Sequence, residues 1–202
     1  MKLYYSPGAS SLSPHIVLRE AGIPVELVKV DLKTRKTADG GDYAALNAKG
    51  YVPMLELDDG RRLTEGPAIV QYIADSRPET RLAPRPEEFA RYELQGWLNF
   101  IATELHKGFS ALFNPAASED WKNAVRARLE TRFDWLAGQL SGRSFVMGQH
   151  FGVADAYLFT VLGWCRFVRI DLARWPVLAE YVARVAARPA VQAAMRAEGL
   201  LK

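Results

Sequence analysis

The sequence predicts an α/β module followed by an all-α module, and three observations support this division. Within residues 1–80, short strand-like runs alternate with helix-like segments. From residue 87 onward the strand pattern disappears, and apolar residues recur at helical spacing. The stretch Leu82-Ala83-Pro84-Arg85-Pro86 separates the two patterns and is typical of a linker. We therefore expect one domain over 1–80, a linker at 81–86 and a helical domain over 87–202.

The elements of the first module follow from alternation, turn residues and helix-ending residues. The expected order is a strand at 3–5, a helix at 14–21 ended by Gly22, a strand at 25–30, a polar connection over 31–50, a hairpin with strands at 54–57 and 62–64, and a helix opened by Glu65-Gly66-Pro67. Asp58-Asp59-Gly60 marks the hairpin turn, because Asp-Gly readily adopts the positive φ that such a turn requires. This order predicts a parallel strand pair to which the hairpin adds antiparallel strands.

The second module contains only helical patterns. Helices are expected over residues 87–109, 121–140, 153–168, 177–187 and 190–197. At the start of the third, Gly152 is the expected N-cap and the Asp155 carboxylate can accept a hydrogen bond from a helix-end N–H, which makes Asp155 a folding residue. Core packing is the favoured role for Cys165 and Phe167 on the same apolar helix.

Composition and charge exclude several classes of protein. Hydrophobic residues make up 49% and charged residues 24%, which is ordinary for a folded globular protein. A net charge of +3, scattered along the chain, does not favour nucleic acid as a partner. No apolar run approaches the ~20 residues of a membrane span, and the start of the chain lacks the apolar region of a signal peptide. We therefore expect no membrane partner and a cytoplasmic location.

The cysteine and histidine residues add two further expectations. Cys165 is the only cysteine, so no intrachain disulfide can form, which agrees with a reducing compartment. The three histidines are dispersed and show no metal-ligand spacing, so we predict no metal site.

Four segments carry a resemblance to a known family. KLYYSPGASSLSPHIVLREAG, LTEGPAIVQYIAD, NFIATELHKGF and FGVADAYLFTVLGW resemble the bacterial beta class of cytosolic glutathione S-transferases. The resemblance implies a thioredoxin-like N-terminal domain that binds glutathione and an all-helical C-terminal domain that carries the electrophile site. It further implies a homodimer, glutathione as a co-substrate with no permanently bound cofactor, and small hydrophobic electrophiles as partners. The chain departs from the class at Ser10, where the class usually has a cysteine.

Ser10 lies in the turn before the first predicted helix, where a hydroxyl can stabilise an anion near the positive helix end. A free thiol has a pKa of about 8.5, so a transferase must lower the pKa of glutathione to hold it as thiolate. One hydrogen bond to a charged acceptor, worth about 1.5–3 kcal/mol, lowers a pKa by about one to two units. Ser10 also suits a turn or N-cap serine, and Ser11 is a rival donor. Unlike a cysteine, Ser10 cannot form a mixed disulfide with glutathione.

Three further positions of the first module are candidate glutathione ligands. In the resembling family the proline of Val52-Pro53 is cis, and the Val52 backbone pairs with the cysteinyl backbone of glutathione; a strand-edge proline without a ligand is the alternative. Gly66 offers a helix N-terminal N–H to the γ-glutamyl carboxylate, and Glu65 can pair with the γ-glutamyl ammonium or simply cap its helix. Arg35 occupies the position of a family lysine and can pair with the glycyl carboxylate.

The second module adds candidates on its first helix. Asn99, Thr103, His106 and Lys107 share one helix stripe, which is either a solvated face or the lining of a cleft. The resemblance matches these four and Glu104 to the glutathione site, with His106 as a hydrogen-bond donor near the sulfur. Glu104 or Lys107 can reach across the dimer. Trp164 either packs in the core or walls the electrophile pocket.

The leading functional hypothesis is an enzyme that transfers the thiol of glutathione to a hydrophobic electrophile. One alternative is a binding protein for glutathione or an apolar ligand, with little turnover because Ser10 replaces the usual cysteine. Another is the use of the same glutathione site for isomerisation or dehalogenation, which no residue of the sequence excludes.

Overall fold

The computed structural model describes residues 1–202, and its internal contacts divide the chain into two compact units. The α/β unit comprises Met1–Ala83 together with Ala187–Lys202. The helical unit comprises Pro84–Ala186. The predicted fold class is confirmed, with a mixed thioredoxin-like sheet in the first unit and only helices in the second.

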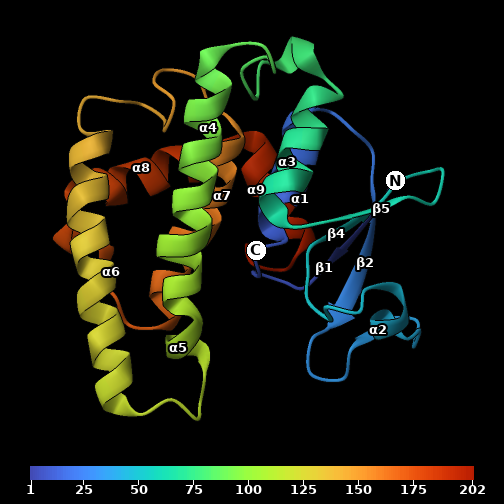
Figure 1. The fold of residues 1–202 in the computed structure, drawn as a ribbon, viewed down its shortest axis with the longest axis horizontal. Helices are drawn as coiled ribbons and strands as arrows, with labels where there is room; N and C mark the ends of the chain where they lie inside the picture. The colour runs from blue at the N-terminus through green and yellow to red at the C-terminus, as the bar shows by residue number, and fades with distance from the viewer. The chain divides into compact units, whose positions relative to one another are not determined.

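A five-stranded sheet forms the centre of the α/β unit (Figure 1). Its strands are β1 (Lys2–Tyr5), β2 (Glu26–Asp31), β3 (Lys36–Thr37), β4 (Met54–Glu56) and β5 (Arg62–Thr64), in the spatial order β3-β2-β1-β4-β5. β1 and β2 are parallel, with Leu3 opposite Leu27, whereas β1 and β4 are antiparallel, with Leu3 opposite Leu55. The predicted parallel pair with an added hairpin is therefore correct.

The expected polar connection over residues 31–50 is partly wrong, because it contains two short elements. β3 extends the sheet at the edge of β2, and α2 (Tyr43–Leu46) forms a single turn. The Asp42 side chain caps α2 by accepting a hydrogen bond from the Ala44 N–H at 2.9 Å. Elements of two and four residues are too short to produce a periodic pattern in the sequence.

Three longer helices complete the α/β unit: α1 (Leu12–Glu20), α3 (Gly66–Asp75) and α9 (Pro189–Ala197). α1 packs against both α3 and α9, and Figure 1 shows the three helices grouped to one side of the strands. Fully buried Ile16 and Val17 of α1 and Ile69 and Ile73 of α3 supply much of the apolar core. Because α9 packs on α1, residues 187–202 join the α/β unit, although they follow the helical stretch in sequence. The domain boundaries expected from the sequence remain a prediction.

The helical unit is built from a chain of helical segments (Figure 1). They are α4 (Phe89–Phe100), a π-helical segment η2 (Ile101–His106), a short turn η3 (Lys107–Phe109), α5 (Ser110–Phe113), α6 (Glu119–Leu140), α7 (Val153–Leu162), η4 (Gly163–Phe167), η5 (Leu172–Arg174) and α8 (Pro176–Ala186). The predicted helix over 87–109 is thus interrupted by η2. A π-helical turn takes more residues than an α-helical turn, and it therefore rotates the residues that follow relative to those before it.

The buried helix α7 lies at the centre of the helical unit, with all ten of its residues buried. Leu129, Phe133 and Leu136 of α6 are also fully buried. Cys165 is buried as expected, but Phe167 is 55% exposed, so the prediction of core packing for Phe167 is wrong. The chain turns from α7 into the short η4, which carries Phe167 away from the buried face and places its ring under the Arg166 guanidinium at 4.6 Å. No helix of the chain combines the length and the apolarity that crossing a membrane demands.

Candidate functional site

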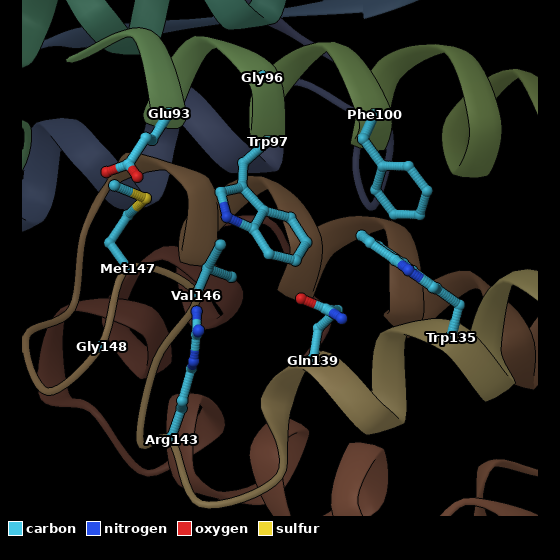
Figure 2. A pocket seen from close by; sticks show the side chains of 10 residues that line it. All are labelled: Glu93, Gly96, Trp97, Phe100, Trp135, Gln139, Arg143, Val146, Met147 and Gly148. Atoms are coloured by element: carbon cyan, nitrogen blue, oxygen red, sulfur yellow. The ribbon is translucent and has the colours of Figure 1, made fainter. Parts of the chain in front are cut away.

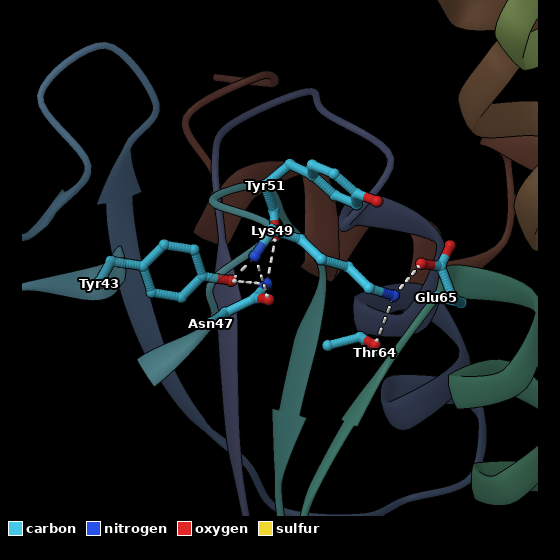
Figure 3. Close-up of polar contacts among 6 residues, drawn as sticks. All are labelled: Tyr43, Asn47, Lys49, Tyr51, Thr64 and Glu65. Atoms are coloured by element: carbon cyan, nitrogen blue, oxygen red, sulfur yellow. Dashed lines mark hydrogen bonds and ion pairs between the residues drawn. The ribbon is translucent and has the colours of Figure 1, made fainter. Parts of the chain in front are cut away.

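A short segment of the α/β unit, residues 49–53, lies beside Ser10, Arg35 and Gly66. Figure 3 shows the polar contacts of its residues Lys49 and Tyr51. The Val52–Pro53 peptide bond is cis, as the resemblance implied, and both residues directly precede β4. Two side chains hold the segment in place by donating to the Tyr51 carbonyl: the Tyr43 hydroxyl at 3.1 Å and the Asn47 amide at 2.9 Å. The segment is therefore a fixed edge beside which other residues can be positioned.

The Ser10 hydroxyl faces this edge. Its oxygen lies 3.3 Å from the Val52 carbonyl oxygen, to which the hydroxyl donates, and the residue is buried. The Ser11 hydroxyl instead belongs to the turn itself, because it accepts from the Ser6 N–H at 3.1 Å and donates to the Ser6 carbonyl at 3.2 Å. Of the two rival hydroxyls, Ser10 is the one beside the 49–53 segment.

Arg35 approaches the same segment from its other end. The residue adopts a left-handed backbone, with φ 55°, and its side chain lies over Gly50. A Cβ atom added to Gly50 would stand 3.1 Å from Arg35 Nε, and Gly50 itself has φ 73°. Gly50 is therefore required both for its backbone conformation and for the close approach of the arginine.

Glu65 and Gly66 lie at the start of α3, next to Pro53. The helix begins at Gly66, where an added Cβ would be 3.8 Å from Pro53 Cγ. Glu65 has φ 72°, and a non-glycine residue in such a conformation costs about 1–3 kcal/mol, a strain that clusters at ligand sites.

Lys49, which was not predicted from the sequence, contacts the candidate site residue Glu65. Its ammonium lies 2.5 Å from Glu65 Oε1 and 3.2 Å from the Thr64 hydroxyl (Figure 3). The hydrogen bond with Glu65 raises the pKa of Lys49, so the lysine stays charged. The position of Lys49 close to Val52-Pro53 in the sequence was the one indication that it lies near the candidate site. No local sequence pattern predicts its contact with Glu65, which is 16 residues away.

His106 of the helical unit lies among aromatic rings. Its Nδ1 is 2.7 Å from the Tyr157 hydroxyl, and its ring meets the edge of Trp164 at a centroid distance of 4.7 Å and an angle of 78°. Trp164 is buried and also contacts Phe109 and Phe113 edge-on. Tyr157 was not predicted as a site residue, although its spacing of seven residues from Trp164 places the two about two turns apart along a helical stretch.

The other predicted residues of this stretch have different surroundings. Asn99, Thr103 and Lys107 are exposed, and the Thr103 hydroxyl donates to the Asn99 carbonyl at 3.0 Å. Glu104 accepts hydrogen bonds from Arg128 at 3.0 Å and Arg132 at 2.8 Å, both on α6, and these bonds lower the pKa of its carboxyl. The roles proposed for these residues at a glutathione site remain predictions.

The chemistry available at these positions is that of hydroxyl, imidazole, ammonium, guanidinium and carboxylate groups. No group of three His, Cys, Asp or Glu side chains is arranged to hold a metal ion. The only thiol, Cys165, is buried, and burial raises its pKa to about 12. The protein's own cysteine is therefore protonated near neutral pH and is a poor nucleophile.

A groove of about 560 Å³ runs between α4 and α6 within the helical unit (Figure 2). Three aromatic side chains line it, with centroid distances of 5.6 Å between Trp97 and Trp135 and 4.6 Å between Phe100 and Trp135. Glu93 and Arg143 supply charges of opposite sign to its lining.

Comparisons with known proteins agree with this architecture. Residues 1–75 match the family model of the glutathione S-transferase N-terminal domain. Residues 119–184 match the family model of the glutathione S-transferase C-terminal domain. The chain is 50% identical to glutathione S-transferase GstA of Escherichia coli O157:H7, over 99% of this chain and all of the relative.

Two solved structures are also similar over nearly the full length. The ternary complex of BphK, a bacterial GST, is 62% identical with a TM-score of 0.98, covering 99% of this chain and 100% of that one. A sphingomonad glutathione S-transferase complexed with glutathione is 48% identical with a TM-score of 0.96 and the same coverage. Beta-class structures are among the neighbours, as the resemblance predicted. The chain belongs to the glutathione S-transferase family and is a glutathione transferase.

Proposed function

We propose that this chain conjugates the thiol of glutathione to small hydrophobic electrophiles, with Ser10 and His106 stabilising the thiolate. In this proposal, residues 1–80 hold glutathione and residues 87–202 carry the electrophile site. The observation that carries it is the gathering of Ser10, Arg35, Glu65 and Gly66 around the 49–53 segment. A single buried thiol also fits the reducing cytoplasm, where we place the enzyme.

The Ser10 hydroxyl can change its hydrogen-bond acceptor when glutathione binds. In this structure it donates to the Val52 carbonyl, a weak neutral interaction at 3.3 Å. An extended peptide that pairs with Val52 brings its own N–H to that carbonyl. The hydroxyl then becomes available to the cysteinyl sulfur, and a hydrogen bond to an anion is stronger than one to a neutral carbonyl. Binding of the peptide and stabilisation of its thiolate are thereby linked.

The charged groups of glutathione have complementary partners. The Arg35 guanidinium suits the glycyl carboxylate, and the Gly66 N–H at the start of α3 suits the γ-glutamyl carboxylate. Glu65 suits the γ-glutamyl ammonium, because Lys49 contacts only one of its two carboxylate oxygens. From the helical unit, the family resemblance adds a set of polar ligands: Asn99, Thr103, Glu104 and Lys107.

A hydrophobic acceptor fits the surroundings of His106. Trp164 forms edge contacts with Phe109, Phe113 and His106, so an apolar wall stands directly beside the imidazole. Phe113 is 48% exposed and extends that wall to the surface. We propose Trp164 as part of the electrophile pocket on this basis.

Ser10→Ala tests the thiolate claim. We expect the pKa of bound glutathione to rise by about one to two units, because a single charged hydrogen bond is lost. The pH dependence of the thiolate absorbance in the parent and the variant measures this shift. Ser11→Ala is the matched control and should leave that pKa unchanged. An unchanged pKa in Ser10→Ala would assign the role to another donor.

A simpler measurement distinguishes the transferase from a binding protein with little turnover. The parent is applied to immobilised glutathione and then assayed with a generic aryl halide. Retention together with conjugation supports the transferase. Retention without any conjugation favours the binding protein, and loss of retention rejects both.

We further propose that the chain forms a homodimer through the groove between α4 and α6. Phe89 and Tyr92 continue the aromatic surface along α4 and are 77% and 64% exposed. Exposed apolar surface of this kind marks interfaces. A two-fold dimer joins the same patch twice, and a patch that carries both Glu93 and Arg143 can complement itself.

Trp135→Arg should convert the dimer to a monomer, because it places a charge in the centre of the aromatic groove. Light scattering after size-exclusion chromatography measures the molar mass, and circular dichroism verifies that the helices persist. Trp121→Arg is the matched control on the same helix, since Trp121 is similarly exposed, at 53%, but lies outside the groove. Equal behaviour of the two folded variants would contradict the assignment.

A further inference from the structure

His106 and Tyr157 form a hydrogen bond, and the acidity and basicity of the two groups determine which of them is the donor. His106 Nδ1 and the Tyr157 hydroxyl oxygen are 2.7 Å apart, a short hydrogen bond that carries one proton. Either the hydroxyl donates to an unprotonated Nδ1, or a protonated Nδ1 donates to the hydroxyl oxygen. The direction of the hydrogen bond therefore decides which nitrogen of neutral His106 carries its single proton: Nε2 if the hydroxyl donates, Nδ1 if the imidazole donates.

The hydroxyl is the better donor of the two. A phenol O–H is a far stronger acid than the N–H of a neutral imidazole, and an imidazole nitrogen is a stronger base than a phenol oxygen. The O–H···N arrangement is therefore favoured, and it leaves the ring proton on Nε2. Trp164, edge-on at 4.7 Å, packs against the same ring and restricts its rotation.

His15 of the same chain carries its proton on the other ring nitrogen, Nδ1. Its Nδ1 lies 2.9 Å from Glu198 Oε1, and both side chains are fully buried. Glu198 also accepts from the Gly8 N–H through its second oxygen, so the carboxylate acts only as an acceptor. Nδ1 of His15 must then carry the proton, while its Nε2 accepts from Arg19 Nε at 3.4 Å.

We infer that Tyr157 is a positioning residue that holds neutral His106 in the Nε2–H tautomer, so that the imidazole presents an N–H donor to the glutathione sulfur. The functional half of this inference rests on the proposed role of His106 as a donor to that sulfur. Without the hydroxyl, both tautomers become accessible, and only one of them can donate from Nε2.

Nitrogen NMR tests the tautomer without any substrate. The chain contains only three histidines, so a long-range proton–nitrogen correlation spectrum of the labelled protein is tractable, and His106→Gln identifies the His106 signals. We expect Nε2–H for His106, Nδ1–H for His15 and an averaged signal for exposed His150. In Tyr157→Phe the His106 signal should move toward the averaged pattern while that of His15 stays unchanged. A parent His106 in the Nδ1–H form, or a His106 signal that Tyr157→Phe does not move, would overturn the inference.

A double-mutant cycle tests the functional half. Tyr157→Phe should lower kcat/KM for glutathione about 2- to 10-fold, the loss expected for one hydrogen bond. The same change in the His106→Gln background should have no further effect, because Tyr157 acts through His106. Tyr72→Phe on α3, at a residue with no proposed role in the site or the dimer, is the matched control and should be silent. An equal loss in both backgrounds would show a merely structural role and reject the inference. Absence of any activity in the parent would reject the proposed function, while the NMR result would still stand.

Discussion

Ser10 and Cys165 show how position decides the reactivity of small polar side chains. Ser10 lies beside the Val52 carbonyl, and its hydroxyl can donate a hydrogen bond but cannot form a disulfide. Cys165 has the thiol chemistry but is 2% exposed, and burial raises its pKa to about 12. A buried thiol lacks both the ionisation and the access that thiol–disulfide exchange requires. The chain therefore holds no protein thiol able to react with bound glutathione.

Ser10→Cys should introduce a thiol that can react with glutathione. Folded Ser10→Cys treated with oxidised glutathione should gain the mass of one glutathionyl group, which intact-protein mass spectrometry detects. The parent under the same conditions should gain none. A glutathionylated parent would show that Cys165 is accessible and would contradict the argument from burial.

At the scale of the element, the start of α7 depends on one carboxylate. Asp155 is fully buried and accepts three hydrogen bonds of 2.8 Å, from the N–H groups of Gly152 and Val146 and from the Tyr181 hydroxyl. The bond to Gly152 satisfies a helix-end N–H, as the sequence predicted. The bonds to Val146 and Tyr181 join α7 to the preceding loop and to α8, so the same side chain also fixes the packing of a fully buried helix.

Asp155→Asn should lower the free energy of unfolding by roughly 2–4 kcal/mol, because the amide nitrogen cannot accept and leaves at least one buried donor unpaired. Urea unfolding followed by circular dichroism measures the change. Asp120→Asn is the control, since Asp120 also lies in the first turn of a helix but is exposed. Similar losses for the two variants would indicate a simple helix-dipole effect in place of the network.

At the scale of the whole molecule, the chain returns to the α/β unit for its last residues. Arg188 forms a two-pronged ion pair with Glu20 at the end of α1, at 2.6 and 2.8 Å. Glu198, just after α9, pairs with buried His15 and with the Gly8 N–H. The C-terminal segment therefore contributes buried polar partners to α1 and to the turn that leads to Ser10.

Glu198→Ala should destabilise the protein by roughly 2–5 kcal/mol, because His15 loses its acceptor while remaining buried. The free energy of unfolding in urea is the measurement. Arg196→Ala, an exposed change on α9, should have little effect. If Glu198→Ala were as mild as that control, water or a repacked side chain would have replaced the carboxylate.

The sequence by itself determined the order of the main elements and the change from an α/β pattern to an all-α pattern, whereas the candidate site residues came from its resemblance to a family and remain predictions. These features are local: Asp-Gly at a turn, Gly66-Pro67 at a helix start and the 3.6-residue period all act through neighbouring residues. The sequence pattern did not reveal β3, α2 or the π-helical η2, because these elements are too short or too irregular to give a period.

Only the tertiary structure decided which distant residues meet. Ser10 with Val52, Lys49 with Glu65, His106 with Tyr157 and His15 with Glu198 are pairs separated by 42, 16, 51 and 183 positions. Such contacts follow from the packing of whole elements, and no periodicity within one segment encodes them.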